Sequence, residues 1–466
     1  MFSLQRLKQI YDLTPMWLKR FSSNMPARLL YGSCYAEQLK FLVQSANWNK
    51  AELSDYQTKK LFALVEFAAT TVPYYRDLFR RLRLPIQMRT LEEFSALPLL
   101  TKDIVREQSD RMISEAIPAR KRYMAKTGGT TFSPLSFWMS SEAYGREWAF
   151  VHDLLSRYGI SRKDRKIVIR GTEFKGISKG LYFQCNPVYA ELQISPFHLN
   201  HTLIQELLPT IKKFSPSYIY GYPSAISAFA KIAREDGLGP GFAFKGVFTI
   251  SESLYDHQKR LIEDAFGCPV FSFYGQSERV IFAGYYPGRE GYYIDPRYGL
   301  TEVIEDELVG TGFLNLATPL LRYRTGDSGV IDYPNGEVKG IDAFPHIKKL
   351  EGRWLQDAIV NKGGQEVSVM VFPYDLFDGI EKFQFVQQEI GKVEVCVVPS
   401  ASFDKELTIK KIIKIIKERV GNEFDFEVKV VSNLVLTSRG KQPLVIQQIA
   451  SRTTGSRRKH ERDMAP

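Results

Sequence analysis

The sequence predicts an α/β fold: a large N-terminal domain of stacked parallel β-α units with a β-rich subdomain, followed by a small, mobile α+β domain. Three observations support this. Strand and helix patterns alternate regularly between residues 135 and 274. Beyond Gly299 the pattern changes to shorter strands separated by Gly and Pro turns. After residue 380, two strands, a helix and a further strand follow one another.

The N-terminal helices are indicated by apolar residues at a helical spacing. Between residues 51 and 71, Leu, Val and Phe side chains recur at a period near 3.6. Pro73 then predicts a helix boundary or kink, because proline disfavours the helical conformation in the residue before it. Further along, Thr101 followed by Asp103 has the chemistry of a helix start.

The central part of the chain predicts repeated β-α units. The expected elements are strand 135–139, helix 141–158, strand 166–170, helix 203–214, strand 217–221, helix 224–235, strand 246–250, helix 255–266 and strand 270–274. Such alternation implies a parallel sheet, and ligands of parallel sheets bind beyond the carboxyl ends of the strands. Ser251, Glu252 and the segment 275–278 fall at such ends.

The domain organisation follows from these patterns. The expected parts are an N-terminal domain over 1–352 with its β-rich subdomain near 299–350, a small C-terminal domain over 358–450 and a basic tail over 451–466. The segment 353–357 between the two domains resembles a known hinge segment. The small domain is predicted from strands at 382–388, 392–398 and 424–431 and a helix at 404–420. The tail lacks hydrophobic periodicity and is predicted to be disordered.

Composition and charge narrow the class of protein. The chain has 466 residues, of which 44% are hydrophobic and 25% charged, as in ordinary globular proteins of two or three domains. Its four cysteines lie far apart, which argues against a disulfide framework or a zinc site. The net charge is +11, but zinc-finger spacing and an RRM-type aromatic signature are absent, so no nucleic-acid partner is predicted.

Two features of the chain bear on membranes. No apolar run reaches membrane-spanning length, and charges interrupt the N-terminal apolar run, so a cytoplasmic protein is predicted. The first thirty residues nevertheless combine five basic side chains with Met16, Trp17 and Phe21. Two interpretations stay open: a helix packed on the large domain, or a helix in weak peripheral contact with the inner face of an anionic membrane.

Four short polar segments occur in a fixed order along the chain. They are Thr127-Gly-Gly-Thr-Thr131, Tyr274-Gly-Gln-Ser-Glu278, Tyr323-Arg-Thr-Gly-Asp327 and Leu436-Thr-Ser-Arg-Gly-Lys441. The first offers backbone N–H groups and hydroxyls to phosphates, and the second a ring and a carboxylate. The third offers an aspartate to ribose hydroxyls, and the fourth a lysine to a phosphoryl centre. Each segment alone is weak evidence, but their order predicts an ATP site.

This order resembles that of the adenylate-forming superfamily of acyl-CoA synthetases, luciferases and peptide-synthetase adenylation domains, and especially its phenylacetate-CoA ligase and CapK-like branch. The resemblance extends from Thr71-Val-Pro-Tyr-Tyr-Arg76, through Leu97-Pro-Leu-Leu-Thr-Lys102 and Gly221-Tyr-Pro-Ser224, to Lys441, so it covers most of the chain.

One segment departs from the family pattern. The family's phosphate loop usually reads Ser-Gly-Thr-Thr-Gly, whereas this chain has Gly128 in place of the serine and Phe132 in place of the closing glycine. A phenylalanine does not readily adopt the positive φ that is open to glycine, so we expect a differently shaped or less mobile loop.

The resemblance implies a role for each segment. The ring of Tyr274 would stack on adenine, Glu278 would bind Mg²⁺, and Asp327 would accept hydrogen bonds from the ribose, with Arg353 as a second contact. Lys441 would meet the charge that develops as the acid attacks the α-phosphorus. The other residues implied in nucleotide binding are Thr127, Gly128, Gly129, Thr130, Thr131, Ser251, Glu252, Gly275, Gln276 and Ser277.

The resemblance also implies an acyl pocket and a hinge. The residues implied to line the pocket are Gly221, Tyr222, Pro223, Ser224, Phe282 and Ala283. Asp357 is the expected hinge about which the small domain rotates between the two half-reactions. His198 and His201 stand close together in the sequence without a third metal ligand, so we expect them to be hydrogen-bonded loop residues.

These features predict an ATP-dependent ligase with Mg²⁺ as its metal. A carboxylic acid and ATP would give an acyl-adenylate and pyrophosphate, and the acyl group would pass to CoA by default. An amine on a sugar, or another acceptor of capsular or surface polysaccharide biosynthesis, is the alternative. A catalytically weakened nucleotide-binding scaffold is a third interpretation, which Phe132 permits but Glu278, Asp327 and Lys441 disfavour.

Overall fold

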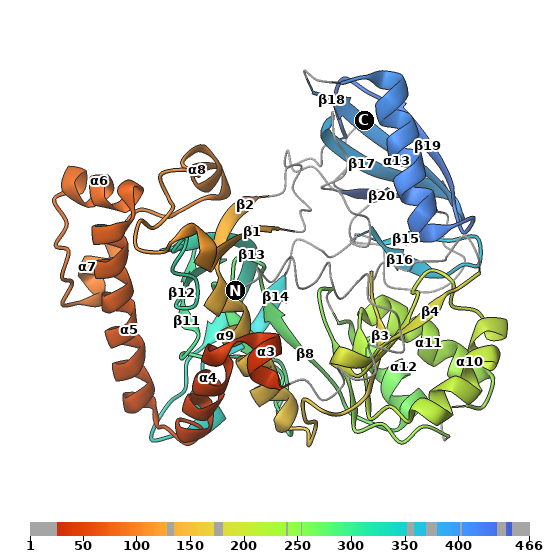
Figure 1. The fold of residues 1–466 in the computed structure, drawn as a ribbon, viewed down its shortest axis with the longest axis horizontal. Coiled ribbons are helices and arrows are strands. Elements are labelled where there is room, and N and C mark those ends of the chain that lie inside the picture. Colours follow the sequence, from red (N-terminus) through yellow and green to blue (C-terminus); the bar gives the residue numbers. More distant parts are fainter. Residues whose placement is uncertain are drawn as a thin grey trace.

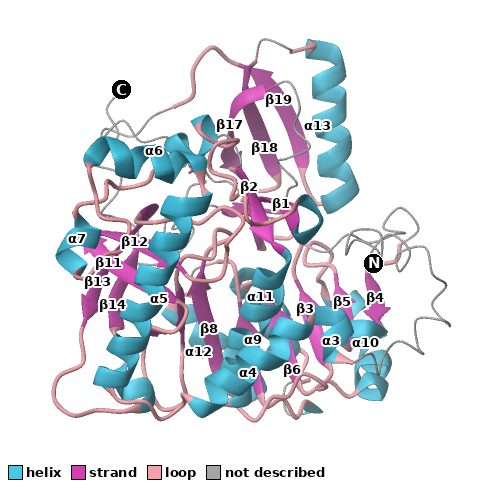
Figure 2. Ribbon diagram, turned by 60° about the vertical axis from the view of Figure 1, so that its left-hand side comes forward, coloured by secondary structure: helices cyan, strands magenta, loops and turns pink. Residues whose placement is uncertain are grey.

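The computed structural model describes residues 26–127, 135–171, 180–238, 241–252, 254–351, 358–369, 380–400, 403–435 and 444–449. Within these ranges the predicted α/β class is confirmed. A twelve-stranded mixed sheet forms the large part of the molecule, and a four-stranded sheet with one helix forms a second unit, at the upper right of Figure 1. Figure 2 shows the same arrangement with strands and helices coloured separately.

One half of the large sheet is mainly parallel, as predicted. Its strands are β3 (Lys166–Ile169), β4 (Phe183–Asn186), β5 (Glu191–Ile194), β6 (Tyr218–Gly221), β7 (Gly246–Thr249) and β8 (Val270–Gly275). The order β8-β7-β6-β3-β5 is parallel throughout, and β4 pairs antiparallel at the edge. The carboxyl ends of β3, β6, β7 and β8 therefore lie at one edge of the sheet.

Helices cover both faces of this half. They are α9 (Ser141–Ser156), α10 (His201–Phe214), α11 (Pro223–Glu235) and α12 (Asp256–Phe266). Alternate strand residues point to opposite faces. Ile167, Ile169 and Ile219 are therefore buried against α10, α11 and α12, whereas Val168 and Tyr220 belong to the core on the α9 side. Burial on both faces explains why these strands are short apolar runs.

The other half of the sheet is antiparallel. Its strands are β9 (Phe282–Gly284), β10 (Tyr292–Ile294), β11 (Gly299–Ile304), β12 (Glu307–Gly312), β13 (Tyr323–Asp332) and β14 (His346–Glu351). Because β8 pairs antiparallel with β9, the parallel and antiparallel halves form one continuous sheet. A hairpin of β1 (Arg122–Lys126) and β2 (Ser136–Ser140) stands apart from it.

The N-terminal helices confirm the expected boundaries. They are α3 (Ala27–Tyr31), α4 (Ser33–Gln44), α5 (Lys50–Thr71), α6 (Pro73–Leu82), α7 (Leu91–Ser95) and α8 (Lys102–Glu107); short 3₁₀ turns lie at Ala119–Lys121, Pro187–Tyr189 and Gly340–Ala343. Pro73 is the first residue of α6, after Val72 in an extended conformation. The Thr101 hydroxyl accepts a hydrogen bond from the Ile104 N–H (3.3 Å) and caps α8.

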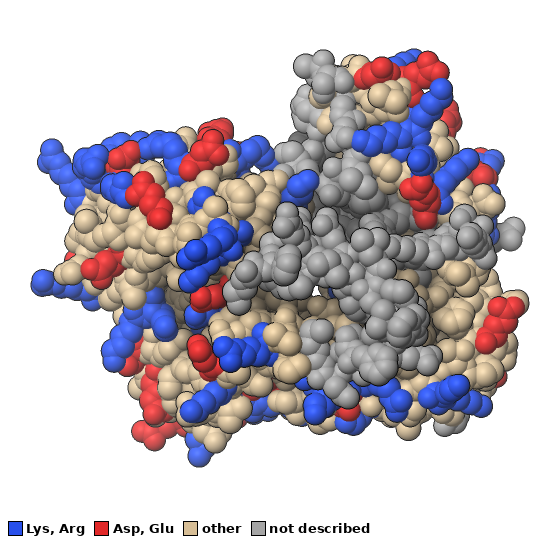
Figure 3. All heavy atoms as spheres, viewed as in Figure 1, with Lys and Arg blue, Asp and Glu red and all other residues tan. Residues whose placement is uncertain are grey.

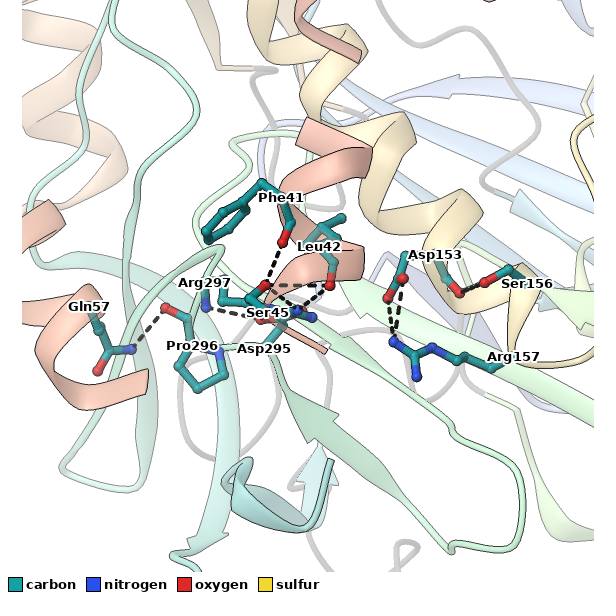
Figure 4. A network of polar contacts seen from close by, with 10 residues as sticks. All are labelled: Phe41, Leu42, Ser45, Gln57, Asp153, Ser156, Arg157, Asp295, Pro296 and Arg297. Carbon is teal, nitrogen blue, oxygen red and sulfur yellow. Dashed lines mark hydrogen bonds and ion pairs between the residues drawn. The ribbon is translucent and has the colours of Figure 1, made fainter. Parts of the chain in front are cut away.

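A buried ion pair connects helix α4 to the segment before β11 (Figure 4). Arg297 and Asp295 have side chains only 1% and 2% exposed, and Nη2 of Arg297 lies 2.6 Å from Oδ2 of Asp295. Arg297 also donates through Nη1 to the Leu42 carbonyl (3.1 Å) and to Oγ of Ser45 (2.9 Å). The guanidinium thus has both a counter-charge and acceptors, which a buried charge requires.

The second unit has its own core. Its strands β17 (Ile380–Glu389), β18 (Lys392–Pro399), β19 (Asp425–Val430) and β20 (Val445–Gln447) pair in the order β19-β18-β17-β20, and α13 (Lys405–Val420) packs on them. A small hairpin of β15 (Ala358–Val360) and β16 (Glu366–Ser368) adjoins it. Phe197 of the large part is buried in this core, and Nε2 of Gln365 donates to the Leu199 carbonyl (2.6 Å).

Several sequence predictions concern the surface and the cysteines. All four cysteines are unpaired, as expected. On the face seen in Figure 3, Lys and Arg side chains are interspersed with Asp and Glu instead of forming one basic patch. In the part of the chain that the structure describes, no helix has the length and apolar character needed to cross a membrane. The N-terminal amphipathic segment up to residue 25 and the tail over 451–466 lie outside the described residues.

Candidate nucleotide and acyl site

Two of the four polar segments meet through a pair of tyrosine–carboxylate hydrogen bonds. Tyr274 in β8 donates its hydroxyl to Oδ2 of Asp327 in β13 (2.8 Å). Tyr323, at the start of β13, donates to Oε1 of Glu278 (2.8 Å). The two carboxylates are 4% and 6% exposed. Each segment therefore contributes one tyrosine and one carboxylate, four residues apart, and each carboxylate accepts a hydrogen bond from the tyrosine of the other segment.

The environment keeps the Tyr274 hydroxyl a donor. Burial, followed by the neighbouring Asp327 carboxylate, raises the pKa of Tyr274 well above its usual range. The phenol therefore stays protonated at neutral pH and can donate to Asp327. The Asp327 backbone N–H is itself bound by the Thr325 hydroxyl (3.1 Å), which fixes the local backbone.

The turn between β8 and β9 is closed by its own polar groups. The side-chain oxygen of Gln276 accepts from the Ile281 N–H (3.1 Å), and the Gln276 carbonyl accepts from the Arg279 N–H (3.0 Å). Arg279 adopts a φ of 57°, a left-handed conformation that is uncommon outside glycine. Gly275 and Ser277 are exposed at this turn, whereas Glu278 points inward.

The phosphate-loop segment begins at the end of β1. The Thr127 N–H donates to the Leu135 carbonyl (2.9 Å), and the Leu135 N–H donates to the Thr127 hydroxyl (2.9 Å). These two bonds close the base of the loop. The predicted loop residues Gly128, Gly129, Thr130 and Thr131, together with Phe132, lie outside the described residues, as do Arg353, Asp357 and Lys441.

The β1–β2 hairpin also contacts the turn that carries Glu278. Nη1 of Arg279 donates to the Tyr123 hydroxyl in β1 (3.2 Å), and its Nε lies 2.5 Å from Oε2 of Glu147 in α9. The segment around Leu100 reaches the same region, because its N–H and carbonyl bond the backbone on either side of Tyr323. Hydrogen bonds therefore join two of the predicted segments to each other, and the hairpin that precedes the phosphate-loop segment to the residue after Glu278.

The residues predicted for the acyl pocket separate into two groups. Gly221 ends β6, and a Cβ placed there would lie 2.0 Å from the Ile169 carbonyl oxygen, so only glycine fits between these strands. Tyr222 is the N-cap of α11 and Pro223 its first residue. The Ser224 N–H donates to Oε2 of Glu252 (3.2 Å), which brings the ends of β6 and β7 together.

Ser251, beside Glu252, also has a positive φ (66°). Non-glycine residues hold this conformation at some cost, and they cluster at functional sites. Phe282 and Ala283 lie in β9, where they pair with Gly275 and Tyr274 at the end of β8. Both are buried, and the Phe282 ring packs against Phe273 with centroids 5.1 Å apart.

The described residues can be tested for metal binding. Among them no group of three or more His, Cys, Asp and Glu side chains could hold a metal ion. Glu278, one of the two buried carboxylates of these segments, has the ligand chemistry that Mg²⁺ uses, because this ion is usually bound by one or two carboxylates plus substrate phosphates and water.

The two histidines are hydrogen-bonded, as predicted. Nδ1 of His198 lies 2.8 Å from the Ser195 hydroxyl, and Nδ1 of His201 lies 2.7 Å from Oδ1 of Asp236. Burial lowers the pKa of His198 to about 4, so this side chain is neutral at physiological pH.

One residue at the strand-end edge was missed in the sequence analysis. Arg170 directly follows β3, at the edge that also carries Gly221 and Ser251. Its signal in the sequence is a charged residue immediately after the apolar run Ile167–Ile169, at the end of a strand where ligands of parallel sheets bind.

Comparison with solved structures identifies proteins that share the fold of this chain. The chain is similar to the crystal structure of 2-hydroxyisobutyryl-CoA ligase in complex with 2-HIB-AMP and CoA, with a TM-score of 0.57 and 19% identity, covering 86% of this chain and 90% of that one. An open conformation of the same ligase gives a TM-score of 0.51 at 19% identity, covering 86% and 93%. The chain therefore has the fold of the adenylate-forming ligases.

Sequence comparison then identifies a particular relative. Residues 359–448 match the family model of the CapK C-terminal domain. The chain is also 25% identical to Protein CapK of Staphylococcus aureus over 469 residues, which cover 95% of this chain and 100% of that protein. The chain is a CapK homologue, and the resemblance inferred from its sequence is confirmed.

Proposed function

We propose that this protein activates a carboxylic acid with ATP and then transfers the acyl group to an acceptor. The observation that carries this proposal is the convergence of separate polar segments on one site. Two of them are joined by the Tyr274–Asp327 and Tyr323–Glu278 hydrogen bonds (both 2.8 Å), beside the hairpin that carries the predicted phosphate loop. A nucleotide bound there would lie at the carboxyl edge of the sheet.

In the first half-reaction, a carboxylate oxygen of the acid attacks the α-phosphorus of ATP. The new bond joins that oxygen to phosphorus, and the bond to the bridging oxygen breaks, so pyrophosphate leaves with the electron pair. Asp327 would accept hydrogen bonds from the ribose and Lys441 would stabilise the developing negative charge. Mg²⁺ would be held by Glu278 together with phosphate oxygens and would neutralise their charge.

In the second half-reaction, a nucleophile attacks the acyl carbon and AMP leaves. CoA is the default acceptor, which the fold shared with 2-hydroxyisobutyryl-CoA ligase supports. A sugar amine or another surface-polysaccharide acceptor is the second candidate. It is favoured by the CapK C-terminal domain, because the small domain would supply the face that meets the acceptor.

ATP–pyrophosphate exchange tests the proposal directly. Labelled pyrophosphate should enter ATP only when a suitable carboxylate is present, and a panel of acids would identify which one. Addition of CoA or an amino sugar should then consume the adenylate. ATP binding without exchange for any acid would overturn the proposal in favour of a nucleotide-binding scaffold.

Replacing Asp327 with asparagine should raise the KM for ATP by about 30-fold, because hydrogen bonds to a charged acceptor are the stronger ones. The test is a cycle with ATP, 2′-deoxy-ATP and 3′-deoxy-ATP. If Asp327 binds a ribose hydroxyl, the deoxynucleotide without that hydroxyl has already lost the hydrogen bond. Asp327→Asn should then raise the KM for that deoxynucleotide very little. Tyr274→Phe is the control, because it keeps the carboxylate and removes only its internal donor. If Asp327→Asn raised the KM for both deoxynucleotides as much as the KM for ATP, Asp327 would not be the residue that binds the ribose.

Replacing Glu278 with glutamine should shift the Mg²⁺ dependence of exchange to concentrations at least about 10-fold higher, because a neutral amide is a poor ligand for a hard cation. Tyr323→Phe provides a matched control: it removes the hydrogen bond to Glu278 but leaves the carboxylate. An unchanged Mg²⁺ titration in Glu278→Gln, with an unchanged maximal rate, would make Glu278 a structural residue.

A further inference from the structure

Arg170 carries a charge that the described residues do not neutralise. Its side chain is half-buried, and the guanidinium carbon lies 5.6 Å from the centroid of the Tyr220 ring. Over the ranges of the chain that the structure describes, it forms no ion pair and no hydrogen bond. Burying a cation without a partner is unfavourable, because the charge loses hydration and gains nothing in exchange.

Other arginines that are withdrawn from solvent do have partners. Arg279 pairs with Glu147, Arg297 with Asp295, and Arg322 with Glu302. These three charges are thus neutralised by carboxylates within the fold. Unlike these three arginines, Arg170 has no carboxylate partner among the described residues. It lies at the edge of the sheet where the substrate is proposed to bind.

Glu191 is an acidic residue whose charge acts on Arg170, but it already has other partners. Glu191 lies 3.4 Å from Nζ of the buried Lys166, and its Oε2 accepts a hydrogen bond from Nε2 of Gln193 (2.7 Å). Its charge is thus balanced by Lys166 and hydrogen-bonded by a neighbour. The remaining groups near Arg170 are tyrosines: Tyr144 in the first turn of α9, Tyr220 and Tyr222. Burial raises the pKa of Tyr220, so its hydroxyl stays protonated and can donate a hydrogen bond to an anion.

The strand order gives the distance between the end of β3, which carries Arg170, and the end of β7, which carries Ser251. Along the edge, β8 carries Tyr274, β7 is followed by Ser251, β6 by Tyr222, and β3 by Arg170. Neighbouring strands lie about 4.8 Å apart, so the ends of β7 and β3 are separated by about 10 Å. An acid with its reacting carboxylate near the nucleotide end would reach Arg170 with its other end.

We propose that the acid substrate carries a second anionic group, about 10 Å from the carboxylate that is adenylated, and that Arg170 binds this group. The inference rests on the proposed function and names the substrate class of the same site. A guanidinium binds a carboxylate or a phosphate through two parallel hydrogen bonds, and the Tyr220 hydroxyl adds a donor beside it. A long dicarboxylic acid is the simplest substrate of this class.

The experiment compares three proteins in ATP–pyrophosphate exchange: wild type, Arg170→Gln and Arg165→Gln. Arg165 is a matched control, because it flanks the opposite end of β3 and also lies over an aromatic ring, that of Phe214 (5.8 Å). The substrates are dicarboxylic acids from glutaric to sebacic acid, their monomethyl esters, and ω-phosphono acids of matching length. The phosphono acids distinguish a phosphate-bearing substrate from a dicarboxylic acid.

Wild type should prefer one diacid over its monoester by about 100-fold in kcat/KM. Arg170→Gln should lose this preference and keep its activity on the monoester, and Arg165→Gln should behave as wild type. Equal loss on both substrates, or a preference that survives in Arg170→Gln, would overturn the inference. A thermal melting curve of Arg170→Gln that matches wild type shows that the variant is folded.

Direct binding separates this inference from the proposed function. Calorimetric titration of wild type and Arg170→Gln with the diacids requires no adenylation. Diacid binding that depends on Arg170, without exchange, would reject adenylation and keep the anion site. Exchange with monoanionic acids alone would keep adenylation and reject the anion site, and the absence of both effects would reject both.

Discussion

Replacing Lys441 with alanine is expected to lower the rate of ATP–pyrophosphate exchange by about 1000-fold. The sequence around Lys441 resembles the catalytic loop of adenylate-forming enzymes, in which the ammonium meets the charge that forms at the α-phosphate. Because this contact is stronger in the transition state than in the ground state, kcat should fall much more than the affinity for ATP. Exchange kinetics and equilibrium binding of ATP measure the two quantities separately.

Lys410→Ala is the control for this prediction. Lys410 lies on the exposed side of α13 in the same unit, where its Nζ is 2.9 Å from Oε1 of Glu406. The substitution Lys410→Ala removes a lysine from the C-terminal unit without changing a residue of the proposed site, so the rate of exchange should stay at the wild-type value. Near-normal exchange in Lys441→Ala, or an equal loss in both variants, would contradict the catalytic role.

Replacing Asp295 with alanine is expected to lower the stability of the large part by about 3–5 kcal/mol. The substitution leaves Arg297, whose side chain is 1% exposed, without its counter-charge, although its bonds to Leu42 and Ser45 stay (Figure 4). An uncompensated buried cation is strongly unfavourable. The shift in the urea midpoint of the transition that reports on the large part measures the effect.

An exposed pair of the same length is the control. Nη2 of Arg289 lies 2.6 Å from Oδ1 of Asp342, but these side chains are 31% and 59% exposed. Asp342→Ala should therefore cost less than about 1 kcal/mol. Replacing both members of the buried pair, as Asp295→Leu with Arg297→Met, should recover part of the stability lost in Asp295→Ala. An equal loss of stability in Asp295→Ala and Asp342→Ala would show that burial does not determine how much stability is lost when an ion pair is broken.

Local patterns predicted the individual elements well. The parallel strands and their helices between residues 166 and 275 lie close to their expected bounds, because strands buried on both faces are short apolar runs between amphipathic helices. β4 and β5 were not predicted, since polar residues such as Gln184, Glu191 and Gln193 interrupt their apolar pattern. Their pairing in the sheet buries Glu191 and Gln193 and leaves Gln184 half-buried, and periodicity does not report such an environment.

Long-range pairing was the harder part. The order of the polar segments predicted that Tyr274, Glu278 and Asp327 would serve one site, and this stays a prediction. The structure joins Tyr274 to Asp327 and Tyr323 to Glu278 by hydrogen bonds. Their connection through two crossed tyrosine–carboxylate bonds depends on how β13 aligns with the turn after β8, which no local pattern encodes. Phe282 and Ala283, which were assigned to the acyl pocket, are buried in β9 opposite Gly275 and Tyr274, and their assignment stays a prediction.

The single continuous sheet has a consequence for how related proteins could diverge. Each strand end along its carboxyl edge presents its own short segment. Under the proposed function, the residues that would meet the far end of the acid lie on different strands from those that would meet the nucleotide. A substitution after β3 or β6 could change which acid is accepted while leaving Tyr274 and Asp327 undisturbed. Substrate choice and nucleotide chemistry can thus evolve separately on one rigid scaffold. Relatives that use other acids should differ first at the positions equivalent to Arg170 and Tyr222.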